Sequence, residues 1–281
     1  MIYFPNNEKE LRGIIGEKNI IISGGTDVMV RRRIGKIDES SDFISLDKIK
    51  DLNSITEEKD GIRIFCRATH SDILDSLVIK NNFPILIDAV SEIGSTQIRN
   101  RGSLVGNVVN ASPAGDGILA LFLLDAILEI VNSEGDVKNI KVEDFITGPG
   151  KTMLQSNEYV RSVKIPFLNR EYHQMFRKIG QRKAMAISIA SMGLLIETRG
   201  DKISDLRIAF GSVAPKVLRL YKAEKEAFGR NLDLNTVRYL SNIVFEEVSP
   251  IDDIRSSAEY RRKVCRNLVL ELEDTLNINN N

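Results

Sequence analysis

The sequence of 281 residues is poor in metal-ligating side chains and has no tryptophan. Its two cysteines, Cys66 and Cys265, lie far apart without a C-x-x-C spacing, and its two histidines, His70 and His173, are equally scattered. A zinc site or an iron–sulfur cluster needs several such ligands at short spacings. The sequence therefore predicts no metal site in this chain, and isolated cysteines without an export signal predict a reducing compartment.

Neither sign of charge is in excess, because Lys+Arg and Asp+Glu both number 39. No global field would attract nucleic acid or an anionic membrane, and the Arg31-Arg32-Arg33 run indicates a solvated helix face. The most apolar segment, "GILALFLLDAILEIV", is interrupted by Asp125 and Glu129 and is too short to span a bilayer. The N-terminus also lacks the pattern of a signal peptide. We expect a cytoplasmic protein with no membrane span and no nucleic-acid partner.

The order of helical and strand patterns predicts an α+β chain in three parts. Residues 1–53 have the pattern of a β-α-β-α-β unit, and residues 54–168 combine strands with helices around the weakly periodic stretch 94–117. Residues 169–281 begin with extended segments, two of them joined by a hairpin turn at Gly200-Asp201. They end with helical patterns over 215–228, 234–247 and 257–274.

A first glycine loop follows the apolar run "NIII", where Gly24-Gly25 leads into a helix that Thr26 or Asp27 can cap. Unpaired N–H groups at the start of a helix suit a phosphate, and glycine lets the backbone approach it closely. The loop matches neither common phosphate-binding glycine motif. Taken alone, it is better explained as a left-handed turn with a capped helix.

The second loop, residues 94–117, is rich in glycine, asparagine and hydroxyl side chains. Its regularly placed apolar residues, such as Ile98 and Leu104, indicate that it folds back onto the core. Asn107 can form hydrogen bonds with a phosphate or a ring carbonyl, and Asp116 can accept one from a ribose hydroxyl. Two such loops together would suit a large, polar ligand that carries phosphate; the alternative is that the glycines only permit close packing.

Five segments in chain order resemble the FAD-binding medium subunit of molybdenum hydroxylases. They are "SGGTD" after an isoleucine run, "QIRNRGSLVGNVVNASPAGD", "FITGPGKTML", "FRKIGQRKAMAISIAS" and "DDIRSSAEYRRKV". This family includes xanthine dehydrogenase FAD subunits, carbon monoxide dehydrogenase medium subunits and nicotinate dehydrogenase. The stretches "GPGKT" and "RIAFGSVAP" are most similar to bacterial xanthine dehydrogenase FAD subunits.

The resemblance implies an α+β fold of the vanillyl-alcohol-oxidase (PCMH) type, with FAD between subdomains 1–53 and 54–168 and a C-terminal α+β domain at 169–281. It also implies an FAD-carrying electron-transfer subunit of a heteromeric oxidoreductase. A large subunit with a molybdopterin-type molybdenum cofactor would hydroxylate the substrate. A small subunit would relay electrons through [2Fe-2S] clusters, and FAD would pass them to an acceptor such as NAD. No catalytic side chain is expected here, because the redox chemistry belongs to the cofactor.

Carried over by motif, the resemblance implies a set of cofactor-binding residues. The segment from Ile20 to Asp27 would hold the pyrophosphate, the segment from Gly102 to Asn107 would form the second loop, and Lys178 would stabilise negative charge on the flavin or form a structural salt bridge. Within this set, Ile98 would lie near the flavin, and Ser112 and Asp116 would lie near the ribose and adenosine. The implied residues are Ile20, Ile21, Ile22, Ser23, Gly24, Gly25, Thr26, Asp27, Ile98, Gly102, Ser103, Leu104, Val105, Gly106, Asn107, Ser112, Asp116, Val160 and Lys178.

Two positions depart from the family pattern: Val105 stands where family members usually carry glycine, and Gly115 stands where a serine is common, which should matter little. If the position of Val105 needs a positive φ, valine there would be strained. Two other functions stay open on the sequence. A stand-alone flavin-dependent reductase or oxidase would need its own acid and base groups, for which only Tyr159, Tyr172, His70 and His173 are candidates. A non-catalytic nucleotide-binding module would bind no flavin.

Overall fold

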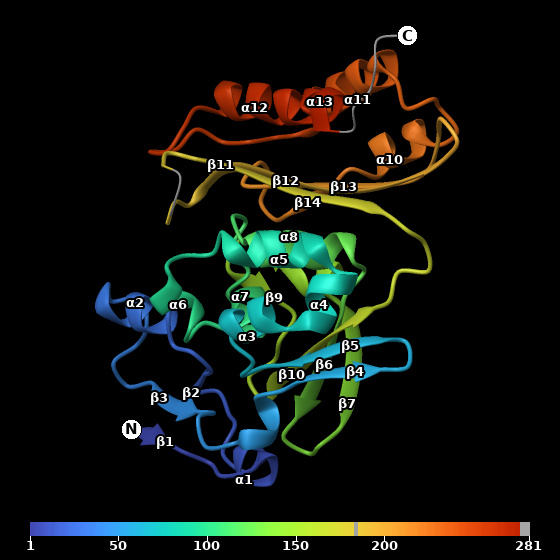
Figure 1. Cartoon of the computed structure of the whole chain (residues 1–281). Coiled ribbons are helices and arrows are strands. Elements are labelled where there is room, and N and C mark those ends of the chain that lie inside the picture. Colours follow the sequence, from blue (N-terminus) through green and yellow to red (C-terminus); the bar gives the residue numbers. More distant parts are fainter. Residues whose placement is uncertain (183–184, 276–281) are drawn as a thin grey trace. The chain divides into compact units, whose positions relative to one another are not determined.

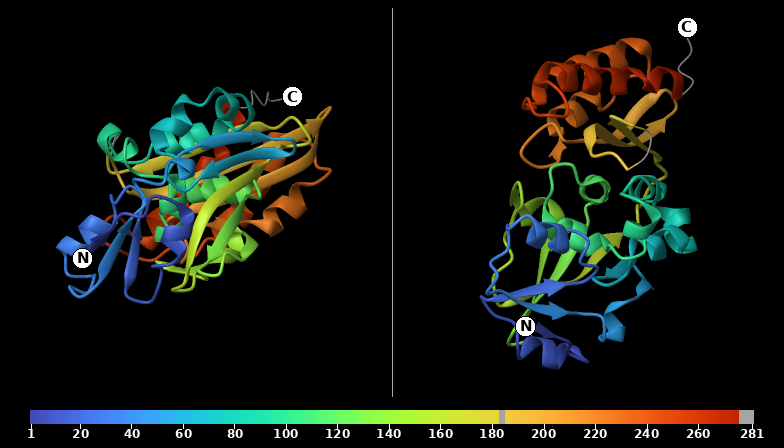
Figure 2. Two further views of the ribbon diagram at one scale, coloured as in Figure 1. Left: turned by 90° about the horizontal axis from the view of Figure 1, so that it is seen from below. Right: turned by 90° about the vertical axis from the view of Figure 1, so that its left-hand side faces the viewer.

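A computed structural model describes residues 1–182 and 185–275, which form two compact units (Figures 1 and 2). Unit 1 comprises Met1–Asn82, Ile93–Ala111 and Asp125–Phe167, and unit 2 comprises Phe83–Glu92, Ser112–Leu124 and Leu168–Asn281. Unit 2 therefore takes two short segments from the first 168 residues. The boundaries at residues 53 and 168 stay a prediction. In the described ranges, no helix is long and apolar enough to cross a membrane.

Unit 1 begins with a small parallel sheet in the order β1-β3-β2, as the β-α-β-α-β pattern predicts. Helix α1 starts after Asn7, whose side chain accepts a hydrogen bond from the Glu10 N–H and so satisfies one of the unpaired groups of the first turn. The connections from β1 to β2 and from β2 to β3 run through the two helices. The elements are β1 (Ile2–Tyr3), α1 (Glu8–Arg12), β2 (Asn19–Ile22), α2 (Val28–Arg33) and β3 (Asp42–Ser45).

The second sheet of unit 1 is antiparallel, in the order β4-β5-β10-β6-β7. Its central strand is β10, whose register shifts between Val160 and Ser162, and this shift interrupts the alternation of apolar and polar residues. The strands are β4 (Ile55–Glu58), β5 (Gly61–Phe65), β6 (Ile127–Asn132), β7 (Val137–Lys141) and β10 (Glu158–Pro166). The remaining elements here are η1 (Lys50–Leu52), α3 (His70–Asp75), α4 (Leu77–Asn82), α9 (Val142–Phe145), β8 (Ile146–Gly148) and β9 (Lys151–Thr152).

The stretch 94–117 contains short helices that the sequence interpretation missed. Helix α6 covers Thr96–Arg99 and helix α7 covers Leu104–Asn110. Ser103 caps α7, because its hydroxyl accepts a hydrogen bond from the Gly106 N–H at 3.1 Å. Both helices are too short for a periodic pattern to stand out. The expected burial is confirmed for Leu104, which is fully buried, and is wrong for Ile98, which is 39% exposed.

Unit 2 is built on the antiparallel sheet β11-β12-β13-β14. Helices α5 and α8 pack on one face, where a Cβ at Gly193 would lie 2.3 Å from Leu119 and 3.3 Å from Ile85. Helices α10, α11 and α12 cover the other face. The elements are α5 (Pro84–Ser91), α8 (Asp116–Leu123), β11 (His173–Gly180), β12 (Ser188–Arg199), β13 (Lys202–Gly211), β14 (Leu218–Arg219), α10 (Tyr221–Ala227), α11 (Leu234–Glu247), α12 (Ala258–Leu270) and α13 (Leu272–Thr275).

The helix predicted over 215–228 is wrong in its first half. Leu218 and Arg219 pair with Phe210 and Ala209 of β13, so they form strand β14, and α10 begins only at Tyr221. The sequence pattern cannot distinguish an apolar residue in a short edge strand from an apolar residue in the first turn of a helix. The helix predicted over 234–247 coincides with α11.

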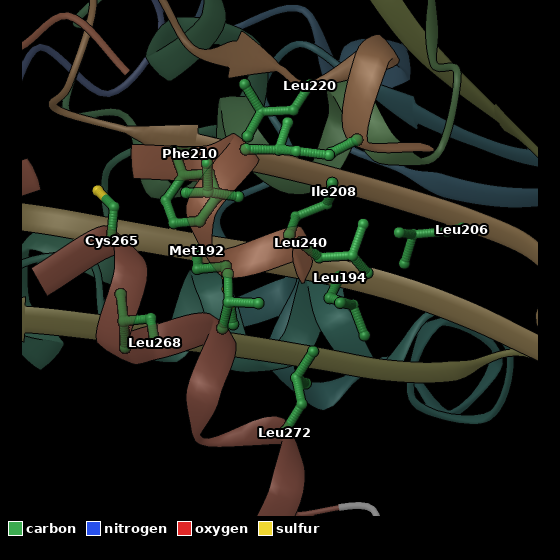
Figure 3. Packing of buried hydrophobic residues seen from close by; sticks show 14 of the residues in the cluster. Met192, Leu194, Leu206, Ile208, Phe210, Leu220, Leu240, Cys265, Leu268 and Leu272 are labelled. Carbon is green, nitrogen blue, oxygen red and sulfur yellow. The ribbon is translucent and has the colours of Figure 1, made fainter. Parts of the chain in front are cut away.

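The core of unit 2 lies between this sheet and α10–α13, and Figure 3 shows Phe210, Met192 and Leu194 of the sheet facing Leu240, Cys265 and Leu268 of the helices. Truncating Phe210, which is fully buried, leaves a cavity. We expect Phe210→Ala to lower the free energy of unfolding by about 3–5 kcal/mol, measured by urea denaturation. The matched control is Phe228→Ala, because that ring is 71% exposed and should matter little. Equal losses in the two variants would contradict this account of the core.

Candidate cofactor site

The two glycine loops meet, backbone against backbone, in unit 1. A Cβ on Gly24 would lie 1.8 Å from the carbonyl oxygen of Arg101 and 3.0 Å from the Cα of Gly102. Likewise, a Cβ on Gly102 would lie 3.1 Å from the Ile98 carbonyl oxygen and 3.4 Å from the Thr26 hydroxyl. Only glycine permits this approach at Gly24, since a backbone carbonyl cannot rotate away as a side chain can.

The first loop is held in place just before its glycines. The Ser23 hydroxyl donates to the Cys66 carbonyl at 2.8 Å, which ties the loop to the residue after β5. Gly25 has φ +75°, a conformation in which glycine is unstrained. Asp27 occupies the N-cap position of α2, but its side chain makes no capping hydrogen bond, so the expected cap is wrong for this residue.

The second loop leaves a buried acceptor without a partner. In the described structure, Asn107 Oδ1 has no hydrogen-bond partner, and neither has Nδ1 of the buried His70. Such groups are costly to bury alone, so a ligand that donates a hydrogen bond to Asn107 would be favoured. Val105 lies inside α7 with an exposed fraction of 4% and no positive φ, so the strain considered for valine does not arise.

The loops line a cavity of about 350 Å³, which falls in the size range of small-molecule sites. Its third wall is the segment 154–160 at the start of β10, from which the sequence motifs indicated only Val160. The register shift that follows Val160 has no signature in the sequence. The lining residues that sequence reasoning missed are Asn19, Val28, Arg31, Leu46, Cys66, His70, Ile93, Val109, Asn110, Leu154, Gln155, Ser156, Glu158 and Tyr159.

Most titratable side chains around this cavity are electrically neutral or paired. Burial lowers the pKa of His70 to about 4 and raises the pKa of Cys66 to about 12, so both are neutral at pH 7. The Tyr159 hydroxyl donates to the Glu8 carboxylate, and burial with this bond raises the pKa of Tyr159. Glu158 forms an ion pair with Lys138 at 2.6 Å. Burial raises the pKa of Asp27, and the charge of Arg31 opposes that shift.

Unit 2 holds its own polar cluster around Asp116. Lys178 Nζ lies 2.7 Å from Asp116 Oδ2 and donates to the Glu92 carbonyl oxygen at 2.9 Å, while the Ser188 hydroxyl donates to Asp116 Oδ1 at 2.9 Å. The side chains of Lys178 and Asp116 are only 7% and 5% exposed. Burial raises the pKa of Asp116, and the contacts with Lys178 and Ser188 oppose that shift. A salt bridge was one of the two roles considered for Lys178.

The structure brings most of the predicted cofactor residues to the unit 1 cavity. Ile22 and Leu104 are not part of its lining, and Ser112, Asp116 and Lys178 belong to unit 2. The predicted residues that line the cavity are Ile20, Ile21, Ser23, Gly24, Gly25, Thr26, Asp27, Ile98, Gly102, Ser103, Val105, Gly106, Asn107 and Val160.

Comparison with known proteins decides the family. Residues 2–168 match the family described as "FAD binding domain in molybdopterin dehydrogenase", which is more than half of the chain. The chain belongs to this family of FAD-binding domains. Residues 175–274 match "CO dehydrogenase flavoprotein C-terminal domain". Together, these matches confirm the resemblance seen in the sequence and make the chain an oxidoreductase subunit with an FAD-binding domain.

Two curated relatives of this FAD-binding subunit are each 30% identical to it. One is the glyceraldehyde dehydrogenase medium chain of Sulfolobus acidocaldarius, aligned over 83% of this chain and 82% of the relative. The other is the xanthine dehydrogenase FAD-binding subunit of Escherichia coli, aligned over 86% and 82%. Among solved structures, carbon monoxide dehydrogenase from Hydrogenophaga pseudoflava has a chain with a TM-score of 0.90 at 22% identity, covering 99% of this chain and 96% of that one. This likeness confirms the predicted α+β fold.

The residues of the unit 1 cavity fit part of an FAD molecule. The glycines have no side chains, so a ligand can approach the backbone closely. Among the described residues, Asn107 Oδ1 has no donor and can accept a hydrogen bond from a hydroxyl or an N–H of the ligand. Ile98 and Val160 supply apolar surface. The cavity therefore offers both the polar and the apolar contacts that a dinucleotide with a flavin ring needs.

Proposed function

We propose that this chain is the FAD-carrying electron-transfer subunit of a multi-subunit molybdenum hydroxylase. The match of residues 2–168 to the FAD-binding family carries the proposal. The contact of the two glycine loops supports it, because among the described residues the cavity beside them holds a buried amide oxygen without a partner. When bound, FAD supplies a carrier that exchanges electrons with both one-electron and two-electron partners. The chain's own part is to bind and orient this carrier.

Within this function, the first loop would hold the FAD pyrophosphate, since Ser23 to Asp27 combine close backbone approach with the N-terminus of α2. The second loop would hold the ligand through Asn107 and the capped start of α7. Ile98 and Val160 would contact the flavin ring. Ser112, Asp116 and Lys178 stay predicted cofactor contacts on the strength of the family motifs.

The proposed partners are a large subunit with a molybdopterin-type molybdenum cofactor and a small subunit with [2Fe-2S] clusters. Relatives are described as medium chains or subunits of glyceraldehyde, carbon monoxide and nicotinate dehydrogenases, and of nicotine 6-hydroxylase. Electrons would enter from the [2Fe-2S] clusters and leave from FAD to a soluble acceptor such as NAD, in the cytoplasm.

Purification of the tagged chain from its native cell tests this function. We expect two further subunits to co-purify, with molybdenum and iron in the complex and flavin in this chain. The isolated chain should oxidise no organic substrate. The complex should reduce an electron-accepting dye when an organic substrate is supplied. Turnover of an organic substrate by the isolated flavin-loaded chain would contradict the proposal and favour a stand-alone flavoenzyme.

A further inference from the structure

Arg31 is the cationic side chain of the proposed FAD cavity. Among the residues that the structure describes, the ionisable side chains of the lining are Asp27, Arg31, Cys66, His70, Glu158 and Tyr159. His70, Cys66 and Tyr159 are neutral at pH 7 because burial shifts each pKa away from that range. Glu158 already has Lys138 as its counter-charge. Within the described part of this lining, Arg31 is therefore the cation that is available to an anionic ligand.

A pyrophosphate needs such a cation here. Two phosphates bring two negative charges, and moving them out of water into a partly enclosed site is costly without compensation. Backbone N–H groups provide dipoles but no net charge. Asp27 adds to the negative charge that must be compensated, since its carboxyl group lines the same cavity.

The geometry of α2 places Arg31 where it can act. Its N–H donates to the Asp27 carbonyl at 2.9 Å, so the two residues are one helical turn apart and share a face of the helix. The charge of Arg31 already reaches the Asp27 carboxyl group, whose pKa it lowers against the effect of burial. Gly24, where the two loops approach each other most closely, lies three residues before Asp27.

We propose that the Arg31 guanidinium pairs with the FAD pyrophosphate and offsets the Asp27 charge beside it. This inference rests on the proposed function, because it places FAD in the unit 1 cavity. It separates the roles of the three consecutive arginines. Arg32 lies over the Phe43 ring, with 5.0 Å from its Cζ to the ring centroid, and Arg33 is not part of the cavity lining.

The test measures FAD binding to the full-length chain after removal of its flavin, by quenching of FAD fluorescence. We expect Arg31→Gln to raise Kd about 10- to 30-fold, which corresponds to the loss of one charge-assisted hydrogen bond in a partly enclosed site. Arg33→Gln removes the same charge from the same helix and should leave Kd within about 2-fold. Salt should weaken wild-type binding more steeply than binding by Arg31→Gln between about 0.05 and 0.5 M KCl, because screening acts on the charge that the variant lacks.

Each other outcome decides a different point. Equal Kd values for wild type and Arg31→Gln would overturn the role of Arg31 and leave the proposed function standing. An equal loss in Arg31→Gln and Arg33→Gln would mean that the helix acts through its total charge, which also overturns the pairing. A wild-type chain that takes up no FAD would overturn the proposed function itself. Melting curves by circular dichroism should agree among the variants, because all three arginines are exposed.

Discussion

Gly24→Ala should abolish FAD retention. The added methyl group would overlap the Arg101 carbonyl oxygen, only 1.8 Å from the Cβ position, and would push apart the two loops that form the cavity. Because the new methyl group would overlap backbone atoms rather than a movable side chain, we expect unit 1 also to lose about 3 kcal/mol or more of its unfolding free energy. Flavin absorbance per chain after gel filtration measures the first effect, and urea denaturation measures the second.

Gly148→Ala is the matched control, since a Cβ at Gly148 meets no atom within 4 Å. Gly25→Val tests the same loop by another route. Its φ of +75° strains a β-branched residue without the backbone overlap that occurs at Gly24. We expect this variant to lose flavin as well. Full flavin content in Gly24→Ala or in Gly25→Val would show that the first loop is a structural turn only.

Lys178→Met should be the most damaging single change in the polar cluster of unit 2. It leaves the buried carboxylate of Asp116 without its cation, and breaking such a pair costs about 3–5 kcal/mol. The difference in unfolding free energy between wild type and Lys178→Met should shrink as the pH falls through the pKa of Asp116, because the protonated carboxyl group needs no cation. Burial raises this pKa. Urea denaturation at several pH values measures both effects.

The double variant Lys178→Met/Asp116→Asn provides the control. The amide keeps the size of the side chain and can still accept from Ser188, but it carries no charge. We expect the double variant to regain at least half of the stability that Lys178→Met loses, which gives a positive coupling between the two sites. A loss of less than about 1 kcal/mol in Lys178→Met would contradict the importance of this pair.

The sequence predicted the parts of the site that depend on local backbone chemistry. The loops at Gly24-Gly25 and Gly102 could be located from their glycines, but taken alone Gly24-Gly25 was better explained as a left-handed turn, and only the ordered family motifs indicated a cofactor site. Tertiary contacts were not recognisable. Tyr159 and Glu158 reach the cavity only because β10 pairs between β5 and β6 and changes register near Val160, and neither property has a local signal.

Helix α7 is a second element that the sequence pattern did not reveal. Its seven residues are too few for a periodic pattern, and the glycine and asparagines within it suggest a loop. The helix forms because Ser103 caps it and because Leu104 and Val108 are buried. Val105 fits without strain because its backbone is helical and has no positive φ, although the family pattern led us to ask whether the position needs glycine.

The most direct test of the account is the identity and amount of flavin bound to the natively purified chain. The protein should absorb in the visible blue and release FAD, close to one molecule per chain, when it is denatured. Chromatography of the released cofactor distinguishes FAD from FMN. FMN in place of FAD, or a colourless chain that remains so after incubation with FAD, would contradict the central claim.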